Sequence, residues 1–324
     1  MKKKSIPILA AGAIGAGVAT VGIGAGVLFY KTVKRPGETD PDIIDEFADR
    51  EKFQEYMVKM APIGEWIQKK EENREFEHIY ITAPDGIKLH AFYLPAGEKH
   101  EKMAIIHHGF TSKAMDGSFH IKAFHEMGYD VLALDLRAHG ESEGKYVGFG
   151  ILDRFDTLEW IRYVRERFGK KMKIILHGTS MGATTALMCT GVPEIREEIS
   201  AVIADCAFTS PDAIFSPVMK KNYHLPPFLF MPVSNMFSQF LAGYKGNDYS
   251  TLQALADNDT VPVLFLHGSE DKFVPTWMTE ENYEACRTMK DRLVIEGAGH
   301  GSSPFEAPEL YVEKEKKFLD KVFA

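Results

Sequence analysis

Cysteine is scarce in this sequence. The chain has three cysteines in 324 residues, Cys189, Cys206 and Cys286, and no two of them have the spacing of a zinc-binding pair. The same scatter suggests no disulfide framework, so the fold has to rest on an ordinary hydrophobic core. Hydrophobic residues make up 45% of the chain, which is enough for one large domain. Cys189 and Cys206 lie in or beside apolar segments, where buried thiols are expected.

Positive charge is also in deficit. The formal net charge is -8 at pH 7, and after residue 35 the lysines and arginines alternate with acidic residues, as in KKEENRE and EKEKK. A nucleic-acid partner demands a continuous basic surface, so we expect none. No pair of histidines has metal-ligand spacing on a helix, and no glycine-rich phosphate-binding motif occurs. We therefore expect neither a metal nor a cofactor.

Charge is absent altogether between Lys4 and Lys31, where the sequence reads SIPILAAGAIGAGVATVGIGAGVLFY. As a helix this run is roughly 38 Å long, which suffices to cross a hydrocarbon core of about 30 Å. A cleaved secretory signal has a shorter apolar region and a small-residue cleavage site. We therefore interpret residues 1–35 as an uncleaved transmembrane anchor. Gly22 and Gly26 have the G-x-x-x-G spacing that lets two such helices pack closely.

The charges that flank this run are nearly balanced. Three lysines precede it, and Lys31, Lys34 and Arg35 follow it. With the terminal amine included, the positive-inside rule favours a cytoplasmic N-terminus. The interpretation is a single-pass protein of the cell membrane whose main domain is extracytoplasmic. Residues 36–42 then form a polar linker, and residues 43–324 form the folded domain.

Short apolar runs alternate with segments of helical periodicity in the folded domain. A leading hairpin is predicted at Pro84, Asp85 and Gly86, which join two β-rich segments. Together the eight segments predict an α/β fold with a mostly parallel eight-stranded sheet and helices on both faces. The six runs that read as buried strands are MAIIHHG, DVLALDL, KIILHG, SAVIADC, VPVLFLHG and DRLVIEG.

Polar residues follow these predicted strands, at the sheet edge where ligands bind in such folds. Ser180 lies between Gly178 and Gly182, which leave room for a tight strand-to-helix turn. An ordinary serine N-cap is the alternative. A serine nucleophile needs a base, and the base needs an orienting acid. His300, in a glycine-flanked loop, and Asp271, shortly after the strand VPVLFLHG, complete such a set in the order Ser, Asp, His.

The motifs HHGF, DLRAHGES, GTSMG, HGSEDKFVP and GAGHG follow one another over residues 77–324 and resemble the α/β-hydrolase superfamily. The most similar branch is the bacterial serine hydrolases related to monoacylglycerol lipases, serine aminopeptidases and acyl-peptide hydrolases. The resemblance implies that Ser180 is the nucleophile, His300 the base and Asp271 the acid. Asp205 is the alternative acid. His267 is expected to pack or to hydrogen-bond at the end of its strand.

The resemblance also implies supporting roles. The backbone N–H groups of Met181 and Phe110 are expected to form the oxyanion hole. This sequence has one glycine before Phe110 where some lipases have three, which leaves the second donor less firmly placed. Asp135, Arg137 and His139 correspond to an element that ties loops together near the site.

Residues 207–255 occupy the position at which hydrolases of this superfamily insert a cap over the site. This segment is rich in Phe, Met and Pro. Phe208, Phe215 and Phe237 are candidates to line an acyl pocket, and the alternative is that they pack the cap onto the sheet. An apolar pocket with no obvious charged anchor favours a small-molecule or lipid-like ester over a charged peptide.

The sequence thus predicts a serine hydrolase that cleaves carboxylic esters of apolar acyl groups through an acyl-enzyme intermediate. A serine peptidase or an acyltransferase with the same triad stays open. A peptidase needs an acidic anchor for the substrate amine, which Glu270 or Asp212 could supply. The third alternative is a non-catalytic, membrane-anchored binding scaffold. No obligate protein partner is evident.

Overall fold

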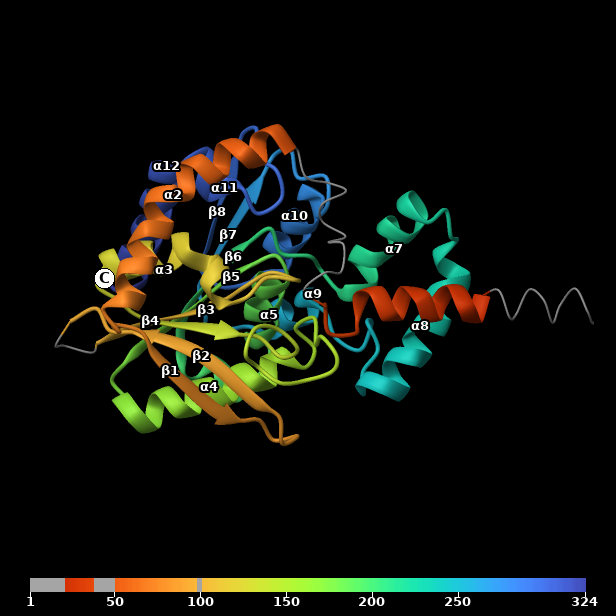
Figure 1. Cartoon of the computed structure of the whole chain (residues 1–324), viewed down its shortest axis with the longest axis horizontal. Helices are drawn as coiled ribbons and strands as arrows, with labels where there is room; N and C mark the ends of the chain where they lie inside the picture. The colour runs from red at the N-terminus through yellow and green to blue at the C-terminus, as the bar shows by residue number, and fades with distance from the viewer. Residues whose placement is uncertain (1–20, 38–49, 98–100) are drawn as a thin grey trace, which may run out of the picture.

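The computed structural model describes residues 21–37, 50–97 and 101–324. Its centre is an eight-stranded sheet in the order β1-β2-β4-β3-β5-β6-β7-β8 (Figure 1). β2 pairs antiparallel with β1 and with β4, and all other neighbours are parallel. The strands are β1 (Glu77–Thr82), β2 (Lys88–Leu94), β3 (Lys102–His107), β4 (Asp130–Asp135), β5 (Lys173–Thr179), β6 (Ile199–Asp205), β7 (Val263–Gly268) and β8 (Lys290–Ile295).

The predicted α/β architecture with a mostly parallel eight-stranded sheet is confirmed. Successive side chains of a strand point to opposite faces, and here both faces are covered, so the central strands are apolar throughout. In β3, Met103 and Ile105 enter the core on one face, while Ala104 and Ile106 enter the core on the other.

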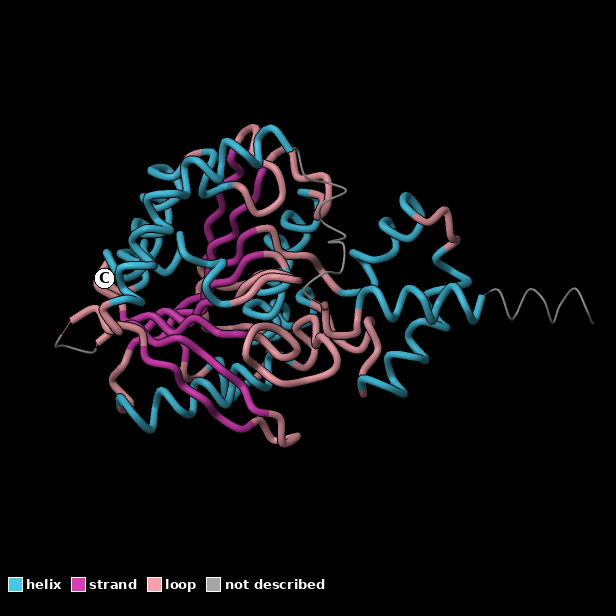
Figure 2. The backbone as a smooth tube through the Cα atoms, viewed as in Figure 1, coloured by secondary structure: helices cyan, strands magenta, loops and turns pink. Residues whose placement is uncertain are grey.

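Helices cover both faces of the sheet (Figure 2). α4 and α5 pack on one face through residues such as Trp160 and Leu187, and α3 and α12 pack on the other through Phe124 and Phe318. The helices in chain order are α2 (Arg50–Glu72), η2 (Ala114–Gly117), α3 (Ser118–Glu126), α4 (Asp153–Phe168), α5 (Met181–Cys189), α6 (Pro193–Arg196), α7 (Pro211–Asn222), α8 (Pro227–Ala242), α9 (Thr251–Asp257), α10 (Thr276–Ala285), α11 (Ser303–Glu306) and α12 (Pro308–Val322).

Two helices between β6 and β7 stand away from the sheet (Figure 1). These are α7 and α8, which we call the cap helices, and they lie within the segment 207–255. α7 begins at Pro211, and the Ser210 hydroxyl before it accepts a hydrogen bond from the Ala213 amide at 3.2 Å. This is the usual way to satisfy a free amide at a helix start.

The end of the apolar N-terminal run, residues 21–30, packs together with the cap helices. Residues 21–32 are helical and pack on the cap helices (Figure 1). Ala25 and Leu28 are buried against Met219 of α7 and Phe230 of α8. The interpretation of the whole run as a membrane segment separate from the hydrolase domain is therefore wrong for residues 21–35. Apolar side chains bury as well against a protein surface as against lipid, so composition alone did not separate the two.

The predicted transmembrane anchor has no support in the described residues. Within residues 21–37, 50–97 and 101–324, no helix is both long enough and apolar enough to cross a membrane. Residues 1–20, which form most of the predicted anchor, lie outside the described residues, as do residues 38–42 of the predicted linker.

The close helix packing at the cap uses a glycine outside the predicted G-x-x-x-G pair. A Cβ atom at Gly24 would lie 2.6 Å from the ring of Phe230, so a larger residue there would force this ring to shift. Gly22 has no such neighbour within 4 Å, and Gly26 has only the Phe237 ring at 3.9 Å.

Candidate active site

The turn between β5 and α5 is strained and built around Ser180. This residue has φ 55 and ψ -113, in the region that favours glycine. A Cβ at Gly178 would lie 2.2 Å from the backbone of Gly182, and a Cβ at Gly182 would lie 2.1 Å from the carbonyl oxygen of His107. Both glycines are therefore required by the close approach of the helix to β3 and β5.

Ser180 occupies the N-cap position of α5, but its side chain makes no capping hydrogen bond. Its Oγ lies 2.9 Å from Nε2 of His300 instead. His300 Nδ1 lies 2.7 Å from Oδ2 of Asp271. The structure therefore brings together the three residues that the sequence singled out, from three separate segments of the chain. The ordinary N-cap alternative for Ser180 does not fit this geometry.

The carboxylate of Asp271 is held from both sides. Its Oδ1 accepts hydrogen bonds from the amides of Phe273 at 2.9 Å and Val274 at 2.8 Å. Its Oδ2 faces His300 and also His267 Nε2 at 3.1 Å. Burial alone raises the pKa of Asp271, but the charge of His300 and the hydrogen bonds from both imidazoles outweigh burial and hold the pKa below its usual value. Asp271 is thus kept ionised opposite His300.

Asp205, the alternative acid, takes a different place. Its main-chain carbonyl accepts the Ser180 amide at 2.8 Å, and its carboxylate Oδ2 accepts the Tyr311 hydroxyl at 3.1 Å. Burial raises the pKa of Asp205 to about 6. The carboxylate that hydrogen-bonds His300 is that of Asp271, so the structure favours Asp271 for the role of acid.

Two backbone amides next to Ser180 are available to a ligand. Met181 and Phe110 are both buried, and within the described part of the chain neither of their N–H groups donates a hydrogen bond. Met181 starts α5, where the helix dipole favours negative charge. The loop before Phe110 approaches Ser180, since a Cβ at Gly109 would lie 3.7 Å from Cβ of Ser180. Buried amides without partners are rare, which fits a site for a developing oxyanion.

The loops after β3 and β4 are tied together behind these amides. His139 Nδ1 donates to the carbonyl oxygen of Arg137 at 3.0 Å, and its Nε2 accepts the Thr111 amide at 3.3 Å. Burial lowers the pKa of His139 to about 3, so the ring is neutral and can donate through one nitrogen while it accepts through the other. Arg137 binds Asp156 through two hydrogen bonds of 2.6 Å. These contacts match the structural role expected for this element.

Asp135 has a similar supporting place. Its carboxylate accepts the Ala114 amide at 2.8 Å and the Glu141 amide at 3.0 Å, and it faces His90 Nδ1 at 2.7 Å. Burial raises its pKa, but these hydrogen bonds outweigh burial and leave the pKa of Asp135 below its usual value. The carboxylate therefore stays ionised while it anchors the loops after β3 and β4.

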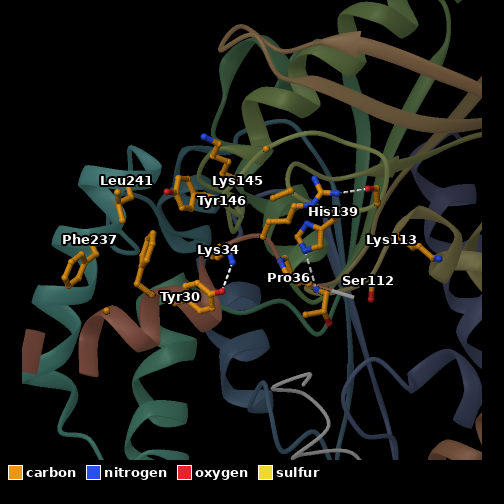
Figure 3. A pocket seen from close by; sticks show the side chains of 18 residues that line it. Tyr30, Lys34, Pro36, Ser112, Lys113, His139, Lys145, Tyr146, Phe237 and Leu241 are labelled. Atoms are coloured by element: carbon orange, nitrogen blue, oxygen red, sulfur yellow. Dashed lines mark hydrogen bonds between the residues drawn. The ribbon is translucent and has the colours of Figure 1, made fainter. Parts of the chain in front are cut away.

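A pocket of about 1000 Å³ lies beside this loop cluster (Figure 3). Of the three phenylalanines proposed from the sequence, only Phe237 lines it. Phe215 lines a smaller cavity, and Phe208 is buried with its main chain hydrogen-bonded to Thr184. Phe208 and Phe215 are both part of the hydrophobic core, as the packing alternative expects.

The sequence analysis missed the contribution of the N-terminal segment to this pocket. Tyr30 and Tyr146 line it (Figure 3). Phe29 also lines it, and the rings of Phe29 and Tyr146 lie 5.6 Å apart. Two backbone hydrogen bonds fix the segment. The Val147 N–H donates to the Val33 carbonyl at 2.7 Å, and the Arg35 N–H donates to the Lys145 carbonyl at 2.8 Å. Large side chains lie on all sides of residues 21–32, so the periodicity gave no signal for this contact.

Three groups of side chains in the described residues could supply ligands to a metal ion, with ligand atoms within 4.8 Å of one another in each group. They are His78, His90 and Glu141; His120, His177 and Glu315; and Cys206, Asp271 and His300. In the second group the rings of His120 and His177 lie 4.1 Å apart and are tilted by 37°. In the third group Asp271 and His300 already hydrogen-bond each other.

Comparison with known proteins agrees with this architecture. The alpha/beta hydrolase family matches residues 104–314. The chain is 28% identical over 317 residues to the uncharacterised protein YqkD of Bacillus subtilis, which covers 97% of both chains. It is 30% identical over 241 residues to the uncharacterised protein YfhR of Salmonella typhimurium, which covers 70% of this chain and 75% of YfhR.

Among solved structures, the esterase Pf2001 of Pyrococcus furiosus is similar, with a TM-score of 0.62 and 25% identity over 76% of this chain and 92% of Pf2001. The family match, the order of the strands in the sheet and the similarity to an esterase all indicate an alpha/beta hydrolase. The chain therefore belongs to the alpha/beta hydrolase family and is a hydrolase.

Proposed function

We propose that this hydrolase cleaves carboxylic esters of apolar acyl groups, with Ser180 as nucleophile, His300 as general base and acid, and Asp271 as the orienting carboxylate. The observation that carries the proposal is the chain of two hydrogen bonds, 2.9 Å from Ser180 Oγ to His300 Nε2 and 2.7 Å from His300 Nδ1 to Asp271 Oδ2. A serine hydroxyl alone is a weak nucleophile, and this arrangement supplies the base that it needs.

The proposed reaction has two halves. Ser180 Oγ attacks the ester carbonyl while His300 Nε2 takes its proton, and Asp271 stabilises the resulting imidazolium. The oxyanion of the tetrahedral intermediate accepts hydrogen bonds from the amides of Met181 and Phe110. The intermediate expels the alcohol, which receives the proton from His300, and leaves an acyl ester on Ser180. Water then attacks this ester with His300 again as base, and the acid and free Ser180 are released.

The lining of the pocket offers no acidic anchor for the amine of a peptide substrate. As far as the chain is described, it combines aromatic and aliphatic side chains with the cations Lys34, Arg35, Lys113 and Lys145, and it includes no Asp or Glu and none of the three triad residues. Asp212, one of the two possible anchors for a substrate amine, accepts a hydrogen bond from Asn235 at 2.8 Å and lines the smaller cavity. Glu270 does not line the pocket. Neither carboxylate is therefore placed to bind an amine there.

A fluorophosphonate probe tests the proposal directly. The purified full chain should become covalently labelled, and Ser180→Ala should abolish labelling, because the probe reacts only with an activated serine. A panel of p-nitrophenyl esters and peptide amides should then show turnover of the esters. Amide turnover that exceeds ester turnover would favour the peptidase. A folded wild-type chain that neither reacts with the probe nor turns over any ester would contradict the proposal and favour a non-catalytic scaffold.

Membrane anchoring by residues 1–20, which lie outside the described residues, and an extracytoplasmic hydrolase domain stay predictions of the sequence. Alkaline extraction of membranes from cells that express the full chain tests the anchor. Protease accessibility in intact spheroplasts tests the side on which the domain lies.

A further inference from the structure

α8 carries large apolar side chains on its outer side. Phe230, Ser234 and Ser238 are buried, whereas Phe228, Met236 and Phe240 have exposed fractions of 77%, 68% and 87%. The three exposed residues lie within about 120° of one another around the helix, so they share one face. We call this the outward face of α8. A helix in contact with water normally has polar side chains on its outer face, so this apolar surface indicates an apolar neighbour.

The N-terminal helix that packs on α8 has the same property. Ile23 and Val27, one turn apart, are 70% and 50% exposed. The opposite side of this helix holds the buried residues Ala25 and Leu28. Both helices are therefore apolar on the inside and on the outside, a pattern typical of surfaces that face lipid or another protein.

The charges around this surface favour lipid. Residues 21–32 and α8 contain no Asp or Glu, although the chain as a whole has a net charge of -8. Lys31 lies 5.4 Å over the ring of Tyr223, which follows α7, and the last turn of α7 carries Lys220 and Lys221. A rim of lysines attracts anionic lipid headgroups. A second copy related by two-fold symmetry would instead bring the same lysines near one another.

The sequence that leads into this surface has the same character. Residues 5–20 read SIPILAAGAIGAGVAT and contain no charge, and they join the cap at residue 21. We propose that the outward face of α8, together with Ile23 and Val27, lies against the apolar surface of a lipid bilayer, with Lys31 and Lys220 near the headgroup phosphates. This inference goes beyond the proposed ester hydrolysis and does not depend on it.

Site-specific fluorescence tests the proposal. The three native cysteines are buried, so a single introduced cysteine can be labelled selectively. The full chain carrying Phe240→Cys, labelled with an environment-sensitive dye, is reconstituted with vesicles of phosphatidylcholine and phosphatidylglycerol. The matched control is Lys316→Cys on α12, an exposed position on the sheet side of the molecule. Two quenchers are used: spin labels attached to the acyl chains of the lipid, and iodide ions in the aqueous phase.

The proposal predicts that the dye at position 240 shifts to the blue and is quenched by the lipid-borne label, while the dye at position 316 is quenched by iodide. Equal quenching by iodide at both positions, in protein that floats with the vesicles, would overturn it. Failure of the chain to associate with vesicles would also overturn it. Protection of the dye at position 240 from iodide could also increase with protein concentration and be insensitive to lipid. That result would place a second copy of the chain on this face and would overturn the proposal.

Discussion

His267 Nε2 lies 3.1 Å from Oδ2 of Asp271, the same oxygen that faces His300, and 2.9 Å from the carbonyl oxygen of Val274. A carbonyl can only accept, so Nε2 carries the hydrogen and His267 donates. The Nδ1 atom then accepts from the Thr279 hydroxyl at 2.6 Å. The imidazole is fully buried and held in one tautomer, and it fixes the oxygen on which the orientation of His300 depends.

Replacement of His267 by leucine should therefore slow catalysis without changing substrate binding. Loss of a hydrogen bond to a charged group is worth about 1.5 to 3 kcal/mol, so kcat should fall about 10- to 100-fold while KM stays constant. Thr279→Val, which removes only the outer hydrogen bond, is the control and should lose much less. Equal kcat for wild type and His267→Leu would show that the amides of Phe273 and Val274 alone position Asp271.

Asparagine substitutions separate the two candidate acids. Asp271→Asn should lower kcat about 10,000-fold, because the amide cannot stabilise the imidazolium and favours the wrong tautomer of His300. Asp205→Asn keeps the main-chain carbonyl that holds Ser180, so its kcat should stay within about threefold of wild type. The rate of ester hydrolysis at saturating substrate measures kcat for both variants. The opposite ranking would make Asp205 the acid.

Asp205→Asn should also change how stability depends on pH. The unfolded carboxyl titrates near pH 4, whereas burial raises the pKa of Asp205 in the fold to about 6. The folded state thus binds the proton more tightly, and the wild type loses stability as the pH rises from about 4 through about 6.

The Asp205→Asn variant cannot lose this contribution. Its unfolding free energy, relative to that of the wild type, should increase by about 3 kcal/mol between about pH 4 and about pH 6. Above about pH 6 this difference should stay constant. Urea unfolding of both proteins between pH 4 and pH 8 measures the difference. Other buried carboxyl groups, such as Glu315, are present in both proteins and cancel. Parallel curves would mean that Asp205 has an ordinary pKa in the fold.

Two glycine substitutions compare a crowded position with an open one. Gly182→Ala would place its Cβ 2.1 Å from the carbonyl oxygen of His107, so the turn at Ser180 must shift. We expect loss of fluorophosphonate labelling and a marked loss of stability. Gly64→Ala, within α2, meets no atom within 4 Å and should gain about 0.5 to 1 kcal/mol in urea unfolding. Full labelling of Gly182→Ala would show that the turn tolerates a side chain.

Phe29→Ala tests whether the N-terminal segment forms part of the substrate site. The ring of Phe29 lies 6.4 Å from that of Phe237 and lines the pocket. Its removal should raise KM for esters with long acyl chains and leave the hydrolysis of acetate esters almost unchanged. Phe228→Ala, which alters an exposed ring outside the pocket lining, is the control. An unchanged KM across all chain lengths for Phe29→Ala would place the acyl group elsewhere.

The sequence was sufficient to predict the sheet and the positions of the polar residues at its edge. Each central strand is a short, nearly continuous apolar run, and the residues after it are the ones that a parallel sheet brings to one edge. Ser180, Asp271 and His300 could therefore be named before their distances were known. The assistance that His267 gives to Asp271 depends on the tautomer, which only the hydrogen-bond partners fix.

The sequence was not sufficient to assign residues 21–35. An apolar helix with small residues has the same pattern whether it contacts lipid or other helices. Only the structure shows that Ala25 and Leu28 are buried against the cap helices. The pocket phenylalanines show the same difficulty. Phe215 and Phe237 lie in neighbouring helices of similar composition, yet they line different cavities.

The incorporation of residues 21–37 into the cap and the pocket has a practical consequence for enzymology. Expression from residue 36 onward is the obvious way to obtain a well-behaved preparation of the catalytic part. Such a preparation would lack Phe29 and Tyr30 on the pocket wall and the carbonyl of Val33 that pairs with Val147. On the proposed assignment of this pocket to the acyl group, its substrate preferences would be those of an incomplete pocket, and kinetic constants measured on it would not describe the intact chain.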